Sequence, residues 1–235
     1  MLYAKNLSLI IEDNKLLNNI NLNIEAGSFV CLAGPNGSGK TLLLKTLSGL
    51  LKPSRGQVIL EGQNISAITP RQRSALLRFL PAQQNSVFNY RALDIALMGT
   101  NPYKPWWADY TAADKSAALA ALAKTGAKHQ ANRNIFTLSD GEQQRVFIAQ
   151  ALSGSPRFIL PDEPTSHLDL KQKDDIFKLF LAASKSGMAV LCATHDIDLA
   201  RKYATHICLI KEGRLFKTAL SREITGGDIQ RVYNL

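Results

Sequence analysis

An eight-residue motif constrains this chain more than any other feature of its sequence. The motif fits the pattern G-x-x-x-x-G-K-[ST] in full, and it consists of Gly34, Pro35, Asn36, Gly37, Ser38, Gly39, Lys40 and Thr41. An apolar run precedes it, and a helical pattern closed by Gly49 follows it. A strand, a glycine-rich turn and a helix in this order turn successive backbone N–H groups around a phosphate. We therefore predict a phosphate-binding loop; the alternative is a glycine-rich turn that only caps a helix.

Five side chains are predicted to act on the phosphates, the metal or the attacking water. Lys40 reaches the β- and γ-phosphate oxygens, and the Thr41 hydroxyl is placed to bind Mg²⁺. Such a loop also needs a second metal ligand and a group that activates water. Asp162 and Glu163 end an apolar run and are the predicted Mg²⁺ ligand and general base. His195 ends another apolar run, where α/β sheets bind ligands, and we predict that it contacts the γ-phosphate; a structural histidine is the alternative.

Composition narrows the class of protein without deciding its partner. The chain of 235 residues has 28 Lys and Arg against 19 Asp and Glu, a net charge of +9. This excess suits nucleic acid, an anionic membrane surface or a phosphate-rich ligand, but no run of about five like charges marks a nucleic-acid tail. The three cysteines lie in apolar stretches, which predicts buried thiols and no disulfide framework. The sequence shows neither a secretory signal nor an apolar run of roughly 18 residues, so we expect a cytosolic chain.

Alternating strand-like and helical patterns predict an α/β fold with a parallel sheet and helices on both faces. Short runs with period two, typical of an antiparallel sheet, fill roughly the first thirty residues. Residues 70–85 form a polar stretch, residues 94–152 are mostly helical, and strands and helices then alternate again. We predict a single domain over residues 1–235, with a core of about 1–84 and 156–235 and a helical insertion of about 85–155.

Three further motifs resemble, in order along the chain, those of the ATP-binding-cassette (ABC) ATPases, the motor subunits of transporters. Residues 138–142, Leu-Ser-Asp-Gly-Glu, are similar to the family's signature, which is usually LSGGQ. Residues 166–169 resemble its D-loop, and residues 193–196 resemble its switch-histidine motif. The likeness covers the whole chain. It implies a P-loop NTPase (RecA-like) core with an N-terminal antiparallel β subdomain and an inserted α-helical subdomain, and it implies ATP and Mg²⁺ as ligands.

The resemblance also implies a head-to-tail dimer with two composite ATP sites. Ser139, Gly141 and Glu142 of one copy would hold the γ-phosphate of ATP bound to the other copy. Asp169, from the D-loop, would also border the nucleotide. Independently of the family, a serine and a glycine at the start of a helix form an N-terminus suited to binding an anion.

A finer likeness concerns the class of transporter. Residues 99–106, Gly-Thr-Asn-Pro-Tyr-Lys-Pro-Trp, are similar to a G-R-x-P-[YH]-x-x-W pattern in subunits of iron–siderophore, haem and cobalamin importers. The compact single-cassette length fits the same class. In the alternative interpretation, Tyr103, Trp106 and Trp107 simply pack the insertion onto the core.

Four departures from the family pattern need a structural explanation. Asp140 replaces the first signature glycine and adds a negative charge near a phosphate site. Pro161 has no N–H and is tolerated only where no ladder bond is required, such as a strand end. Ala82 occupies the position of the family's Q-loop glutamine, so neighbouring Gln83 is the predicted contact to Mg²⁺ and water that senses a membrane partner. Ile11 stands where relatives place an aromatic that stacks on adenine, and it offers apolar contact alone.

The leading hypothesis is the ATP-binding and hydrolysing subunit of an importer for an iron–siderophore, haem or cobalamin-like chelate. Its implied partners are a second copy of the chain, two transmembrane permease subunits and, indirectly, a substrate-binding protein; nucleic acid is not expected. The permeases would hold it at the cytoplasmic face of the membrane. The alternatives are a soluble or regulatory cassette that is not coupled to transport, and a subunit for another substrate.

Overall fold

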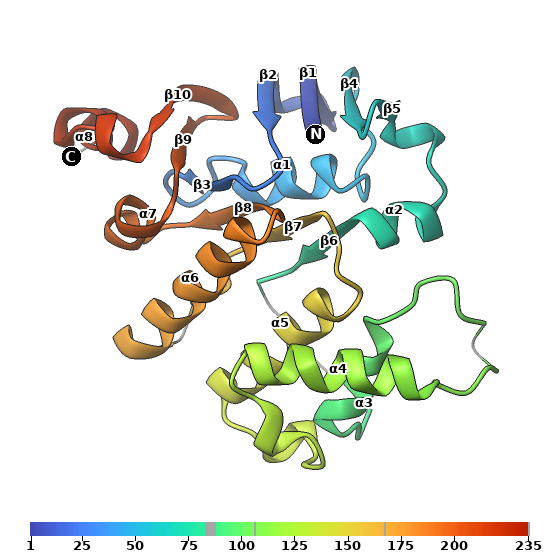
Figure 1. Cartoon of the computed structure of the whole chain (residues 1–235). Helices are drawn as coiled ribbons and strands as arrows, with labels where there is room; N and C mark the ends of the chain where they lie inside the picture. The colour runs from blue at the N-terminus through green and yellow to red at the C-terminus, as the bar shows by residue number, and fades with distance from the viewer. Residues whose placement is uncertain (83–87, 106, 167, 235) are drawn as a thin grey trace.

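The computed structural model describes residues 1–82, 88–105, 107–166 and 168–234 (Figure 1). Its N-terminal part is an antiparallel sheet in the order β2-β1-β4-β5, formed by β1 (Leu2–Ile11), β2 (Asn14–Ile24), β4 (Arg55–Leu60) and β5 (Gln63–Asn64). Leu2 and Ala4 of β1 face the core, and beyond a register shift Leu7 and Leu9 do. Asn6 lies inside the shift with φ 48°, as expected of a bulge that changes which residues face inward.

The second sheet has the order β10-β9-β3-β8-β7-β6. Its strands are β3 (Phe29–Ala33), β6 (Leu77–Leu80), β7 (Phe158–Pro161), β8 (Ala189–Thr194), β9 (His206–Lys211) and β10 (Arg214–Leu220). Neighbouring strands from β9 to β6 are parallel, and β10 pairs antiparallel at the edge. Every residue of β3 and β8 is buried, which explains why these strands read as unbroken apolar runs.

Each face of this sheet has its own hydrophobic core. Val30 and Leu32 of β3 face the antiparallel sheet and α1 (Lys40–Leu47), whereas Phe29 and Cys31 face α6 (Leu170–Lys185) and α7 (Ile197–Tyr203). The sequence predicts helices on both faces of the parallel sheet. Helices α6 and α7 cover one face, whereas α1 and the antiparallel sheet together cover the other. Cys31, Cys192 and Cys208 are buried, as predicted, and burial raises the pKa of the Cys208 thiol to about 11.

The segment predicted as a helical insertion contains α3 (Ala92–Met98), α4 (Ala112–Lys124) and α5 (Asp140–Ser153), which pack on one another (Figure 1). Gly99 follows α3 and lies against α5. A Cβ at Gly99 would lie 1.8 Å from the Gln150 carbonyl oxygen, so only glycine allows the two helices to come this near. The proposed limits of the insertion, 85–155, stay a prediction.

Four elements were not expected from the sequence. The polar stretch contains α2 (Pro70–Leu76) and then β6, and the C-terminal part adds β10 and α8 (Gly226–Tyr233). Arg78 interrupts the apolar run of β6, and its guanidinium donates a hydrogen bond to the Gly99 carbonyl at 2.8 Å. A half-buried charge within a short strand masks the strand in the hydropathy pattern. The remaining single turns are η1 (Ile65–Ala67), η2 (Lys128–Gln130), η3 (Ile135–Thr137) and η4 (Ser221–Glu223).

Candidate active site

The phosphate-binding motif connects β3 to α1, as the sequence predicts. Gly34 has no room for a side chain, because a Cβ there would lie 2.1 Å from the Ile210 carbonyl oxygen. Gly37 and Gly39 have φ angles of 77° and 102°, a conformation that glycine adopts without strain. Gly39 is also the N-cap of α1 and supplies no side-chain acceptor. The first N–H groups of this helix therefore need another acceptor, and an anion suits them electrostatically.

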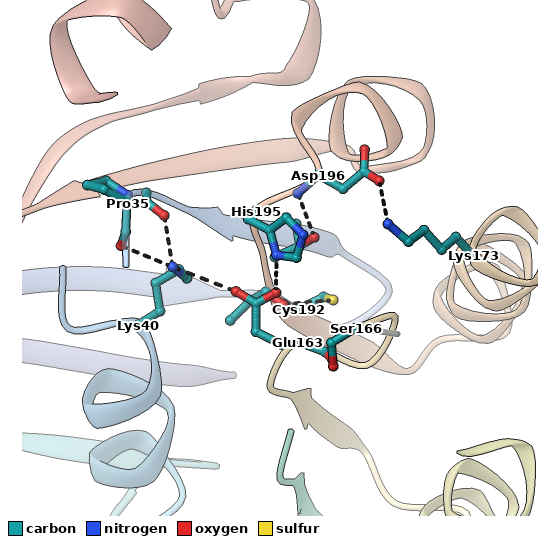
Figure 2. Close-up of polar contacts among 11 residues, drawn as sticks. Pro35, Lys40, Glu163, Ser166, Lys173, Cys192, His195 and Asp196 are labelled. Carbon is teal, nitrogen blue, oxygen red and sulfur yellow. Dashed lines mark hydrogen bonds and ion pairs between the residues drawn. The ribbon is translucent and has the colours of Figure 1, made fainter. Parts of the chain in front are cut away.

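Lys40 lies folded back over the loop that precedes it. Its side chain is 7% exposed, and Nζ donates to the carbonyl oxygens of Gly34 at 2.8 Å and Pro35 at 3.2 Å. Nζ also lies 3.7 Å from Oε1 of Glu163 (Figure 2). A buried ammonium is stable only when it is paired and hydrogen-bonded. The loop thus keeps one strong positive charge at the position where the motif predicts phosphate.

Glu163 is the centre of this charged group. It follows β7 with φ 47°, a left-handed conformation that a non-glycine residue adopts at a cost and that occurs often at functional sites. Oε1 faces Lys40, and Oε2 lies 2.7 Å from Nδ1 of His195 (Figure 2). His195 follows β8 and its side chain is 53% exposed. Two predicted site residues from different strands and Lys40 from the loop are thus in direct contact.

Pro161 lies where the pairing between β7 and β8 is interrupted. The pairs between β7 and β8 end at Ile159, and a single bridge joins Asp162 to Ala193 beyond the proline. Pro161 is the last residue of β7 and still pairs with Leu80 of β6, but on the β8 side its missing N–H falls beyond the last ladder pair. The expectation that this proline occupies a strand end is confirmed.

Asp162 has the environment that a metal ligand requires. Its side chain is buried, and Oδ1 has no hydrogen-bond partner in the described part of the protein. Burial raises the pKa of this carboxyl, and a hydrogen bond with Thr41 acts in the opposite direction. A buried carboxylate oxygen without a partner is costly unless a cation completes it. No group of three or more His, Cys, Asp or Glu that could hold a metal ion occurs among the described residues.

The signature residues cap the start of α5. Ser139 is the N-cap, and its backbone N–H and hydroxyl both donate to Oε2 of Glu142, at 2.9 and 3.1 Å. Oε1 of Glu142 accepts from Gln130 at 2.9 Å. The structure therefore gives Glu142 a capping role within the chain, and its contact with nucleotide stays a prediction. Asp140 is exposed in the first turn, where the helix dipole favours a negative charge.

The remaining predicted residues do not join the contacts around Glu163. Asp169 is the N-cap of α6 and accepts from the Gln172 backbone N–H at 2.8 Å. A Cβ at Gly141 would lie 2.7 Å from Oε1 of Gln172, so the starts of α5 and α6 are adjacent. Ile11 is 42% exposed at the end of β1. Gln83 lies outside the described residues.

One tyrosine near the site was missed. Tyr233 of α8 has a buried hydroxyl, and burial together with the negative charge of Glu163 raises its pKa. It lies 70 residues from Glu163 in the sequence (233 − 163), and no motif marks it, so only the packing of α8 reveals it.

The fold and the site define a P-loop ATPase: the loop joins a parallel strand to a helix, and an acid pair follows a neighbouring strand. The family described as ABC transporter matches residues 17–166, and the chain belongs to this family. The hemin import ATP-binding protein HmuV of Myxococcus xanthus is 34% identical over 94% of this chain and 85% of its own length. The ferric enterobactin transport ATP-binding protein FepC of Escherichia coli is 30% identical over 92% and 81%, respectively.

Solved structures agree with this assignment. An ABC transporter described as of metal-chelate type, in an inward-facing conformation, matches with a TM-score of 0.87 and 28% identity, covering 100% of this chain and 89% of that chain. A dimeric ATP-binding cassette in a post-hydrolysis state with ADP and Pi matches with a TM-score of 0.83 and 31% identity, covering 95% and 100%. None of the described helices combines the length and the apolar character that crossing a bilayer requires.

Ile11 allows a test of the predicted adenine position. Ile11→Tyr should tighten ATP binding by roughly 0.5–1.5 kcal/mol if the ring stacks on the base. Titration calorimetry with ATP measures the change, and Ile10→Tyr, at an equally exposed neighbour of β1, is the matched control. An unchanged affinity for Ile11→Tyr would show that adenine does not contact this position.

Proposed function

We propose that this chain is the ATP-hydrolysing subunit of an importer for a metal chelate such as an iron–siderophore, haem or a cobalamin-like compound. One observation carries the catalytic part: Glu163 contacts both Lys40 and His195 and directly follows Asp162, whose Oδ1 has no hydrogen-bond partner among the described residues. The substrate class is supported by relatives named for hemin and ferric enterobactin transport and by residues 99–106.

The residues of the site divide the reaction among them. Lys40 exchanges the carbonyl oxygens of Gly34 and Pro35 for phosphate oxygens, which are stronger acceptors because they are charged. Thr41 and Asp162 would hold Mg²⁺, which would supply positive charge to the phosphates of the nucleotide. Glu163 accepts the proton of the attacking water, and the products are ADP and phosphate. His195, hydrogen-bonded to Glu163, is placed to contact the γ-phosphate.

A second set of contacts with the nucleotide comes from another copy of the chain. We place Ser139 and Gly141 of that copy against the γ-phosphate, with Asp169 beside it. The adjacency of α5 and α6, through Gly141 and Gln172, supports this arrangement because it joins the signature and the D-loop into one surface. Gln83 keeps its predicted role in sensing the permease. Paired permease subunits would hold the dimer at the cytoplasmic face of the membrane.

The surface proposed for the permease lies on and beside α3. Large exposed apolar side chains occur there, and they are Phe88, Tyr90, Met98, Tyr103 and Trp107. Phe88 and Tyr90 stack edge to face with ring centroids 5.8 Å apart. Trp106 lies outside the described residues. These residues are close in the sequence, and contiguous exposed apolar surface is typical of a protein–protein contact.

Tyr103→Asp should weaken capture of the permease while ATP binding stays unchanged, because an introduced charge would have to be desolvated in the contact. Co-purification of the chain with its permease from detergent-solubilised membranes measures the loss. Phe216→Asp, at an exposed aromatic of β10, is the control and should leave capture intact. If both variants capture the permease equally well, the permease binds another surface of the chain.

Reconstitution tests the proposed function as a whole. The chain, its permease and a substrate-binding protein are reconstituted in proteoliposomes. Uptake of a haem, a ferric siderophore or a cobalamin should then require ATP on the side of the membrane that this chain faces. If none of these three compounds is taken up while ATP is still hydrolysed, the proposed class of substrate is wrong and the proposed ATPase activity stands. A chain that never co-purifies with a membrane protein would instead favour the soluble or regulatory alternative.

A further inference from the structure

A cavity of about 510 Å³ lies at the end of the parallel sheet opposite the phosphate-binding loop. Its lining comes from the ends of α4, α5 and α6 and from the residues that lead into β7 and β8. The active-site residues follow the carboxyl ends of the same strands, whereas Arg157 and Met188 precede their amino ends. The helices α5 and α6, of 14 and 16 residues, are about 21 and 24 Å long at 1.5 Å per residue. The cavity is thus separate from the nucleotide site.

The interior of the cavity suits an apolar chain. Leu152 of α5, Leu179 of α6 and Met188 before β8 supply large apolar side chains, and Ala182 and Ala183 leave the space between them open. A volume of this size falls within the range of pockets that bind small organic molecules. Contact with such a molecule would remove apolar surface from water, which favours binding.

The charges around the cavity are positive. Lys124, at the end of α4, and Arg157 both line it, and none of the described residues that line it is acidic. Lys124 forms no ion pair within the described ranges of the chain, and Arg157 pairs with Glu61 through one of its amino groups. An unpaired ammonium beside an apolar cavity attracts an anion that carries an apolar group.

The C-termini of α5 and α6, which meet at the cavity, do not cancel its preference for an anion. Helix C-termini carry partial negative charge through carbonyl groups that lack partners. At the end of α6, however, the backbone N–H of Ser186 donates to Ala182 and Ala183, and that of Met188 donates to Ala183. Near the end of α5, the N–H of Ser155 donates to the Leu152 carbonyl. Because these carbonyls already have donors, the cations set the charge that a ligand meets.

From this combination we infer that the cavity is a binding site for a medium-chain carboxylate. The carboxylate pairs with Lys124 at the mouth, and the alkyl chain lies between Leu152, Leu179 and Met188. The site is independent of the proposed ATPase reaction. Nucleotide and carboxylate occupy opposite ends of the sheet and do not compete.

Titration calorimetry with decanoate, kept below its micelle concentration, tests this inference on the full chain. Decanoate should bind saturably with one site per chain. Lys124→Ala should weaken it about tenfold or more, because a charge-assisted bond is lost. Lys185→Ala removes a lysine that is exposed on the last turn of α6 but does not line the cavity, and it should change nothing. Decanol should bind more weakly by a similar factor, and ADP should not displace decanoate.

A second variant tests the cavity itself. Ala182→Trp adds a large ring at an exposed helical position that lines the cavity, so it should block decanoate while circular dichroism and ADP binding stay unchanged. Non-saturable binding, equal weakening by Lys124→Ala and Lys185→Ala, or unchanged binding to Ala182→Trp would each overturn the assignment. Failure of ATP hydrolysis would not affect it.

Discussion

Glu163→Gln is expected to slow ATP hydrolysis by roughly 10²- to 10⁴-fold, the usual cost of losing a general base. Glutamine keeps the size of the side chain and can still hydrogen-bond to Lys40 and His195, but it cannot accept a proton from water. ATP binding should therefore persist while turnover nearly stops. Phosphate release under saturating ATP measures the rate, and binding of a fluorescent ATP analogue measures the affinity.

Glu25→Gln is the matched control, since Glu25 is an exposed carboxyl that hydrogen-bonds to Asn23 in the antiparallel sheet. It should hydrolyse ATP at the parent rate. If Glu163→Gln also keeps the parent rate, Glu163 is not the base, and its contacts with Lys40 and His195 are structural. If both activity and ATP binding are lost, Glu163 holds the loop in place.

Lys40→Ala should abolish most ATP binding, with an affinity loss on the order of 10- to 100-fold for one charge-assisted interaction. The remaining backbone N–H groups would face the triphosphate without a positive charge beside them. The variant also leaves the carbonyl oxygens of Gly34 and Pro35 without their donor, so its thermal midpoint must be measured together with its affinity.

Two controls separate binding from folding. Lys52→Ala removes an exposed lysine beyond α1 and should bind ATP normally. Lys40→Met keeps the apolar stem of the side chain, so it should be folded and still fail to bind. Near-normal ATP affinity in a folded Lys40→Met would mean that the loop does not hold phosphate through this lysine.

The sequence predicts those parts of the fold that depend on short-range patterns. The run that becomes β3 is apolar throughout because both faces of the strand are buried, and in the loop after it the positive φ angles of Gly37 and Gly39 are a local requirement for glycine. The strand β6 was hidden because Arg78 interrupts its apolar run, and the guanidinium hydrogen-bonds to the carbonyl of Gly99, which is distant in the sequence. Long-range partners of this kind leave no local pattern.

The same distinction holds for the site. Lys40, Asp162, Glu163 and His195 could be proposed because each follows or opens an element that the sequence marks. Their mutual contacts could not be read, because they depend on β7 and β8 lying side by side. The capping role of Glu142 was also unforeseen, although Ser-x-x-Glu before a helix is the pattern of a capping box.

Light scattering on a sizing column tests the central claim most directly, because it joins the active site to assembly. Glu163→Gln should elute as a monomer alone and as a dimer with ATP and Mg²⁺, since each unhydrolysed ATP would bridge Lys40 of one copy to Ser139 and Gly141 of the other. Adding Ser139→Arg should abolish the dimer and leave ATP binding by the single copy largely intact. A Glu163→Gln chain that binds ATP but stays monomeric would contradict the composite site in the isolated chain. It would also indicate that Asp140 weakens the contact between the signature residues of one copy and the γ-phosphate bound to the other.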